Sequence, residues 1–431
     1  MKKIFTLLFI FIIGGTCTTL GQYIQYVKYT GAIGDEDWTR MWTQFKPNTV
    51  NYLPTNMTLP NIIDKNLTLY KRNTYLLQGI VYVCNGATLT IEPGTLIRGD
   101  KASVGTLVIA KGAKLIANGT ETDPIVFTSN NSPYARQAGD WGGIIILGDA
   151  QINKIGGVAS LDWGLDNKYA MYGGNNDNDN SGSLKYVRIE YCGAKISKDV
   201  ELNGLTLAGV GKGTTIENIQ VSYSNDDSFE MFGGSVYLKN IISYKCSDDD
   251  FDFNFGYNGR VQFAIAVRHP LIADFSGSRC IEADSYSGQK STMDPSKRIT
   301  DFAVANLTLI VLDPNNNTAN INKEAIAIGK DCNISLYNSI ISGFKHGITF
   351  KDENIKEKAV RNEIKMSNNL FNRCEKILYV EANYDEVNAY FTNAGFKNKA
   401  IDYNLNDLLK DPFNKDFPDF RIQAKDFFEA K

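Results

Sequence analysis

The sequence predicts an all-β protein built as a parallel β-solenoid. The main observation is an internal repeat, because residues 216–234 recur 22 positions later as residues 238–256. The identical pairs are Asn218/Asn240, Ile219/Ile241, Asp226/Asp248, Asp227/Asp249, Phe229/Phe251 and Gly234/Gly256. A fixed period in the low twenties, rich in β-branched and aromatic residues between Gly, Asn and Asp, is typical of stacked solenoid coils.

Shorter coils precede this repeat. Residues 89–94 are answered 18 positions later by residues 107–112, and both segments alternate apolar residues before a glycine. Alternation predicts strands, and Gly94 and Gly112 predict tight turns. We therefore expect the β-solenoid to span residues 75–374, with coils of up to about 32 residues in the second half.

Both ends lack the repeat and are expected to cap the solenoid, whose terminal strands would otherwise be open edges. The N-terminal cap is predicted over residues 22–74, where Trp38 and Trp42 suggest a short helical knob or, alternatively, a carbohydrate platform. The C-terminal cap is predicted over residues 375–431, with a helix near residues 403–409.

Residues 1–21 read as a signal peptide, with Lys2 and Lys3 before an apolar run at residues 4–13. We predict cleavage before Gln22; lipid attachment at Cys17 is the alternative. The apolar run is too short to span a bilayer, and no later segment is long and apolar enough. The protein is therefore expected in the periplasm, on the outer membrane or outside the cell.

The net charge of the chain excludes two classes of partner. A formal net charge of −3 gives no general attraction to nucleic acid or to an anionic membrane, so we expect neither partner.

The cysteines after the predicted cleavage site are Cys84, Cys192, Cys246, Cys280, Cys332 and Cys374. They have no close-spaced disulfide framework, and their apolar strand contexts favour small core residues over disulfides.

Asparagines recur just before the apolar strand residues of the later coils. They are Asn218, Asn240, Asn306, Asn338 and Asn369. Asn tolerates tight turns, and its amide can bond to the same amide one coil away. We predict a structural asparagine ladder along one corner.

The doubled segment also predicts a metal site. If Phe251, Phe253 and Phe255 point inward, Asp250 and Asp252 point outward. The 22-residue offset then places Asp226 over Asp248, Asp227 over Asp249, Ser228 over Asp250 and Glu230 over Asp252. Like charges about 4.8 Å apart require a cation or raised pKa values, and clustered carboxylates suit Ca²⁺.

The predicted calcium ligands are Asp226, Asp227, Asp248, Asp249, Asp250, Asp252, Glu282 and Asp284. The alternative is a solvated acidic strip flanked by Lys and Arg. A second candidate metal loop contains Asp177, Asp179 and Ser181 and resembles the start of an EF-hand loop, but its twelfth position is Arg188 instead of Glu. An ordinary Asn- and Asp-rich turn is the alternative there.

Two enzymatic interpretations compete with simple binding. His269 and His346 are the only histidines, which excludes zinc sites built on several histidines. Asp227, Asp248 or Asp249, His269 and Arg298 follow the order of functional residues in β-helical polygalacturonases. Here, however, His269 lies between Arg and Pro, and Thr300 replaces the expected Lys. A pectate-lyase-like reaction with Ca²⁺ and Arg268 or Arg279 as base is the other enzymatic interpretation.

Several motifs in order resemble a family of exported, pectin-lyase-like right-handed β-helix proteins common in Bacteroidota and similar to a leptospiral outer-membrane lipoprotein. The motifs lie at residues 140–144, 178–182, 186–190, 225–234, 248–252, 261–268 and 274–278. The resemblance implies a right-handed β-helix at the cell envelope, without an established activity. Family members usually carry Asp where His269 stands, which counts against the polygalacturonase interpretation.

Taken together, the sequence favours a non-catalytic secreted or envelope-associated scaffold with a calcium-stabilised acidic face. Its expected partner is a glycan or an envelope protein, and its oligomeric state is not indicated by the sequence. The alternative is a polysaccharide lyase or glycoside hydrolase that uses the Asp cluster with Arg268 or His269.

Overall fold

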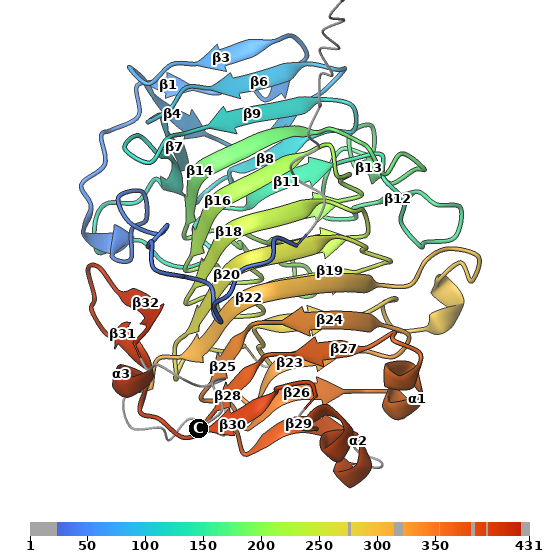
Figure 1. Cartoon of the computed structure of the whole chain (residues 1–431). Helices are drawn as coiled ribbons and strands as arrows, with labels where there is room; N and C mark the ends of the chain where they lie inside the picture. Colours follow the sequence, from blue (N-terminus) through green and yellow to red (C-terminus); the bar gives the residue numbers. More distant parts are fainter. Residues whose placement is uncertain are drawn as a thin grey trace, which may run out of the picture.

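The protein is a right-handed parallel β-helix, as the repeat predicts (Figure 1). The computed structural model describes residues 24–274, 277–313, 322–352, 354–380, 384–393 and 395–423. The predicted signal peptide, including Cys17, lies outside these residues. Within them, the coils form two long sheets of parallel strands, which we call sheet A and sheet B.

Sheet A contains 17 strands and sheet B contains 11. In sheet A these are β1 (Met57–Thr58), β3 (Leu67–Leu69), β4 (Thr74–Leu77), β6 (Thr88–Ile91), β7 (Leu96–Gly99), β9 (Lys114–Asn118), β10 (Ile125–Ser129), β14 (Gly182–Glu190), β16 (Thr215–Ser222), β18 (Tyr237–Tyr244), β20 (Arg260–Arg268), β22 (Asp301–Val311), β24 (Asn333–Tyr337), β25 (Ile340–Ser342), β27 (Lys365–Ser367), β28 (Leu370–Asn372) and β30 (Lys399–Ile401). In sheet B they are β2 (Ile62–Ile63), β5 (Ile80–Val83), β8 (Thr106–Ile109), β11 (Gly143–Leu147), β15 (Leu205–Ala208), β17 (Phe229–Phe232), β19 (Phe251–Asn254), β21 (Ile281–Ala283), β23 (Glu324–Ile328), β26 (His346–Phe350) and β29 (Lys376–Val380).

The repeat sets the register of the coils. Ile219 pairs with Ile241 in sheet A, and Phe229 pairs with Phe251 in sheet B, each at the predicted offset. Inward side chains from both sheets form one continuous hydrophobic core along the β-helix. Because a one-residue slip would turn every core residue outward, the repeat fixes which side chains face solvent.

The predicted asparagines act as bends. Asn218, Asn240, Asn306 and Asn338 have φ between 51° and 57°, a left-handed conformation that Asn tolerates better than most residues. This bend turns the corner in the middle of long sheet A strands such as β16. In the described residues, no hydrogen bond joins the amides of consecutive members, so the predicted ladder is wrong here.

Asn369 belongs to a different column. The left-handed residue of its coil is Asn368, with φ 59°. Asn369 instead faces inward, where its Nδ2 donates to Asn398 Oδ1 at 2.9 Å and its Oδ1 accepts from Ser339 N at 3.0 Å. One amide-to-amide hydrogen bond between neighbouring coils therefore exists inside the β-helix, one position after the bend.

The β-helix extends beyond both predicted boundaries. Parallel pairing begins when β1 pairs with β4 and continues until β28 pairs with β30. Residues 24–55 therefore do not cap the first coil. They lie along the outer face of sheet A, beside the middle coils (Figure 1).

This N-terminal segment covers apolar side chains that sheet A presents outward, such as Ile242 and Ile265. Trp42 is fully buried there, with its ring centroid 5.9 Å from that of Tyr186, so the carbohydrate-platform interpretation is wrong for Trp42. Phe45 also contacts Phe420 of the C-terminal segment. The two chain ends thus share one lateral cluster.

Short elements complete the fold. They are the hairpins β12 (Ala159–Ser160) with β13 (Met171–Tyr172) and β31 (Leu409–Asp411) with β32 (Asp419–Ile422), the helices α1 (Ile355–Val360), α2 (Tyr384–Phe391) and α3 (Leu405–Leu408), and 3₁₀ turns at Pro47–Thr49 and Lys290–Thr292. α3 falls within the predicted C-terminal helix. The six cysteines from Cys84 to Cys374 are free; the first five are buried, as expected for core residues, and Cys374 is half-buried. No helix among the described residues is long and apolar enough to cross a membrane.

Candidate metal centre

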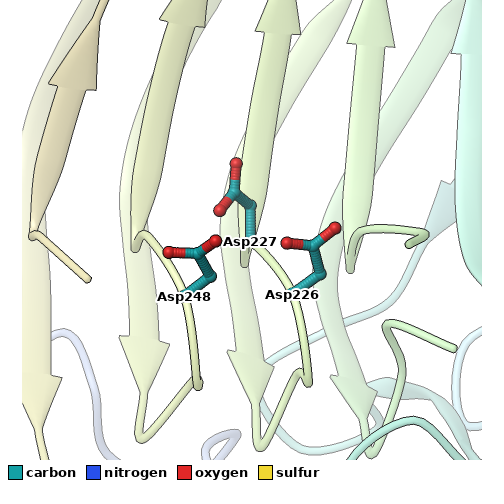
Figure 2. A group of neighbouring side chains, drawn as sticks. All are labelled: Asp226, Asp227 and Asp248. Atoms are coloured by element: carbon teal, nitrogen blue, oxygen red, sulfur yellow. The ribbon is translucent and has the colours of Figure 1, made fainter. Parts of the chain in front are cut away.

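The candidate site lies on two successive turns that lead from sheet A into sheet B. We call residues 223–228, between β16 and β17, and residues 245–250, between β18 and β19, the acidic turns. Figure 2 shows Asp226 and Asp227 on one of these turns and Asp248 on the next, with the three carboxylates close together. The 22-residue repeat places the turns side by side because it places the flanking strands in register.

Two carboxylate groups have the spacing of a metal site. The first is Asp226, Asp227 and Asp248; the second is Asp227, Glu230 and Asp252. In each group one oxygen per residue lies within 4.8 Å of the others. Asp227 belongs to both groups, so the five carboxylates form a continuous acidic cluster.

Burial makes this cluster electrostatically costly. Asp227 and Glu230 are only 7% and 8% exposed. Burial, with added repulsion from Asp248 and Glu201, raises the pKa of Asp226 to about 8. Burial followed by neighbouring carboxylates also raises the pKa values of Asp227, Glu230 and Asp252 well above their ordinary range. Without a cation, the cluster must therefore hold protons near neutral pH.

Neutral donors orient the carboxylates. Asp227 Oδ1 accepts the backbone N–H of Asp249 at 2.9 Å. Asn203 Nδ2 donates to Glu230, and Asn254 Nδ2 donates to Asp252 Oδ2 at 2.6 Å. The other oxygen of Asp252 is buried and has no hydrogen-bond partner. Because a buried oxygen without a partner is unfavourable, this atom is a natural ligand position for a cation.

Asp250 is not part of this surface, contrary to the sequence prediction. It is fully buried, and its carboxylate pairs with Arg268 inside the β-helix at 3.1 Å. Ser228, one coil earlier, is buried as well. The alternation of a strand begins only at Phe229 and Phe251, so it does not determine which way the preceding corner residues point.

The alternation also ends earlier than predicted. Phe255 follows β19 with φ 51° and packs against Phe232 outside the main core, 5.3 Å between ring centroids. Asp252 nevertheless faces away from the core as predicted, because its neighbours Phe251 and Phe253 both lie in the core.

Three other predicted ligands lie beside the cluster but have different partners. Asp249 accepts the backbone N–H of Arg279. Glu282 is 3.0 Å from the Arg279 guanidinium and 3.1 Å from Lys351 Nζ, and Asp284 is 3.7 Å from the same lysine. Glu230 takes their place in the cluster. Glu230 is not among the predicted ligands, although the 22-residue offset pairs it with Asp252. That pairing is the feature of the sequence that could have identified it.

The second predicted metal loop is occupied by its own contacts. Asp177 makes a two-point ion pair with Arg298, at 2.6 Å and 3.1 Å. Asp179 Oδ2 accepts from Ser181 Oγ at 3.0 Å and from Gly211 N at 3.3 Å. The two carboxylates bind different partners. These contacts fit the alternative interpretation of the loop as an ordinary Asn- and Asp-rich turn.

The polygalacturonase arrangement does not form. Arg298 binds the carbonyl of Gly234, which follows β17, whereas Asp227 precedes that strand. The arginine and the acidic cluster therefore lie at opposite ends of the sheet B strands. His269 Nδ1 accepts the N–H of Leu271 within its own turn.

Comparison with known proteins identifies the class of this fold. The family described as "pectate-lyase like beta helix domain" matches residues 61–406, and the chain belongs to that family. Among solved structures, an alginate lyase from Paenibacillus sp. str. FPU-7 matches at 15% identity over 74% of this chain and 78% of that chain. Its TM-score of 0.26 is too low to carry an argument about activity. No curated protein matches.

Proposed function

We propose that this protein is a non-catalytic β-helix scaffold that binds a divalent cation, calcium by preference, at the acidic cluster. The observation that carries the proposal is the sharing of Asp227 between two carboxylate groups, each compact enough for one ion. Several carboxylate oxygens on two adjacent turns suit the irregular, oxygen-rich coordination of Ca²⁺ better than the strict octahedron of Mg²⁺. The cation would make the acidic face a contact for a glycan or an envelope protein.

The candidate bases support a binding role over a lyase reaction. Arg268 is fully buried and paired with Asp250, so a polysaccharide cannot reach it. Burial lowers the pKa of the Arg279 guanidinium, but the negative charges of Glu282, Asp249 and Glu324 raise it by more. The net effect is a raised pKa. A group held in its protonated form cannot accept a proton from a sugar.

Two cavities in the described part of the chain are lined by other residues. One, of about 330 Å³, is lined mainly by apolar residues, including Trp163, Leu165 and Leu202. The other is lined by residues around Met293. Neither lining contains a carboxylate of the acidic cluster.

A polysaccharide lyase remains the second candidate function. The observation that favours it is the presence of Arg279 and Lys351 beside Glu282, because cations next to a metal-bound acidic sugar are what such a reaction requires. Incubation with polyuronates and calcium, followed by ultraviolet absorbance of unsaturated products, tests it. We expect no product; calcium-dependent product lost in Lys351→Ala or Arg279→Ala would establish the lyase instead.

Isothermal titration with CaCl₂ after chelator treatment tests the scaffold proposal. We expect saturable binding that is lost in the double variant Asp226→Asn/Asp248→Asn. The matched control is Asp64→Asn/Glu121→Gln, which removes two exposed carboxylates elsewhere and should bind like the wild type. Absence of binding by the wild type would mean that the cluster is only a partly protonated group of carboxyls without a bound cation.

A further inference from the structure

We infer that Arg268 is the positioning residue of the acidic cluster and holds the acidic turns from inside the β-helix. The inference rests on the proposed cation-binding function for its purpose, but its geometry can be tested without a cation. Arg268 is the last residue of β20, and its side chain is fully buried.

The alternation of β20 directs this arginine inward. Ala264 and Ala266 lie in the main core, while Ile265 and Val267 lie in the lateral cluster on the outer face. Arg268 continues the inward series at the corner where the chain leaves sheet A. A buried arginine is rare, because removing its charge from water is costly. In Arg268 the Nη1 and Nε atoms have hydrogen-bond partners, whereas Nη2 is buried without one.

The guanidinium binds the backbone of two successive turns. Its Nη1 donates to the carbonyl of Asp248 at 2.8 Å and to the carbonyl of Arg279 at 3.0 Å. The same nitrogen contacts Asp250 Oδ2 at 3.1 Å, and Nε donates to Asn322 Oδ1 at 3.1 Å. One side chain thus joins the turn that carries Asp248 to the corresponding turn of the next coil.

The counter-ion is also fixed from within. Asp250 Oδ1 accepts from Ser243 Oγ and from Cys246 Sγ, the latter at 3.0 Å. Ser243 Oγ in turn lies 2.7 Å from Ser228 Oγ, on the preceding acidic turn. The buried ion pair therefore reaches both acidic turns and the turn that follows them.

On the outer side, backbone amides complete the arrangement. Asp249 N donates to Asp227 Oδ1, and Arg279 N donates to Asp249 Oδ1. Each carboxylate therefore receives an amide from the next turn in the stack. These bonds depend on the spacing of the turns, which Arg268 sets through the carbonyls. The arginine thereby preorganises carboxylates that it does not touch.

The test compares three variants with the wild type. Arg268→Met/Asp250→Asn removes both charges, so neither partner is left buried and unpaired. Arg268→Lys keeps the charge but not the forked geometry. Arg260→Met, at the other end of β20, is the control. Calcium and magnesium affinities are measured by titration, and hydrogen exchange is followed by mass spectrometry in cation-free buffer.

We expect the double variant and Arg268→Lys to bind calcium about 10-fold to 100-fold more weakly and to lose preference for calcium over magnesium. Exchange should accelerate at the amides of Asp249 and Arg279, while a distant amide such as Ala110, bonded to Val83, stays unchanged. The control should match the wild type in both measurements.

The outcomes separate the two proposals. If the wild type binds no calcium, the proposed function fails, and the exchange data alone decide the role of Arg268. If the wild type binds calcium and the Arg268 variants bind it equally well with unchanged exchange at these amides, the positioning role is overturned. Uniformly faster exchange with unchanged affinity would mean that Arg268 supports only general stability, which also overturns it.

Discussion

Raising the pH should destabilise the cation-free protein, and calcium should remove that effect. The pKa of Asp226 in the folded protein is raised from 3.8 to about 8, mainly by burial and then by Asp248. A carboxyl with a raised pKa is favourable in its protonated form, so its contribution is complete below the unfolded pKa. That contribution is lost as the pH rises from about 4 through about 8, because the folded protein then binds more protons than the unfolded chain.

The expected size follows from this shift. One such group costs about 1.4 kcal/mol per pH unit inside the window, so a rise from about pH 5 to about pH 8 costs at most ~4 kcal/mol. Asp226 is partly exposed, and water screens its charge, so we expect roughly half of that, ~2 kcal/mol. Calcium at about 100 times its Kd should add about 2.7 kcal/mol at the upper end, where the carboxylates are ionised.

The assay is thermal unfolding followed by circular dichroism over this pH range, with a chelator or with calcium. The chelated protein should unfold at lower temperature as the pH rises, and the calcium-bound protein should not. Asp226→Asn/Asp248→Asn should lose the calcium effect and show a weaker pH dependence, because Asp227, Glu230 and Asp252 still have raised pKa values. It should also be more stable than the chelated wild type at high pH. A midpoint in chelator that stays level or rises with pH would refute the reasoning. An equal calcium effect in the variant would place the cation elsewhere.

Three further predictions concern the framework. Trp42→Ala should destabilise the protein by about 3–5 kcal/mol in denaturant titrations, because a fully buried indole between sheet A and the terminal segments is lost. The control is Met41→Ala, which replaces an exposed side chain. Equal effects of the two substitutions would contradict the packing of the lateral cluster. Asn240→Ala should cost about 1 kcal/mol and Asn240→Gly much less, since the left-handed bend at φ 55° penalises a Cβ; equal losses would argue against the bend. Burial raises the pKa of the Cys192 and Cys332 thiols to about 12, so iodoacetamide should label them only after unfolding, and labelling of the native protein at the rate of a free thiol would be inconsistent with this core.

The doubled segment was sufficient to predict the stacking of the acidic residues. Its 22-residue offset gave the pairs Phe229/Phe251 and Glu230/Asp252, and both occur in register. The order of the repeats could also predict the position of the coils, because in a solenoid each coil contacts only its neighbours. The proximity of Asp226, Asp227 and Asp248 is accordingly predictable from the repeat alone.

The corners could not be predicted in this way. Alternation holds only inside a strand, and Asp250 lies one residue before β19 begins, so its inward direction depends on how the turn closes around Arg268. The shift of the bend from Asn369 to Asn368 has the same origin, since both residues are asparagines and only the register of β28 decides which of them turns the corner.

By itself, the sequence determined the β-helix, its period and the acidic face, because a repeat and its alternation dictate which residues stack and which face outward. Only the tertiary structure decided where the chain ends pack and which carboxylates have partners. Residues 24–55 contact coils far along the sequence, and Glu282 and Asp284 meet Lys351 through two sheet B pairings. Such contacts depend on distances across the fold that no local pattern in the chain encodes.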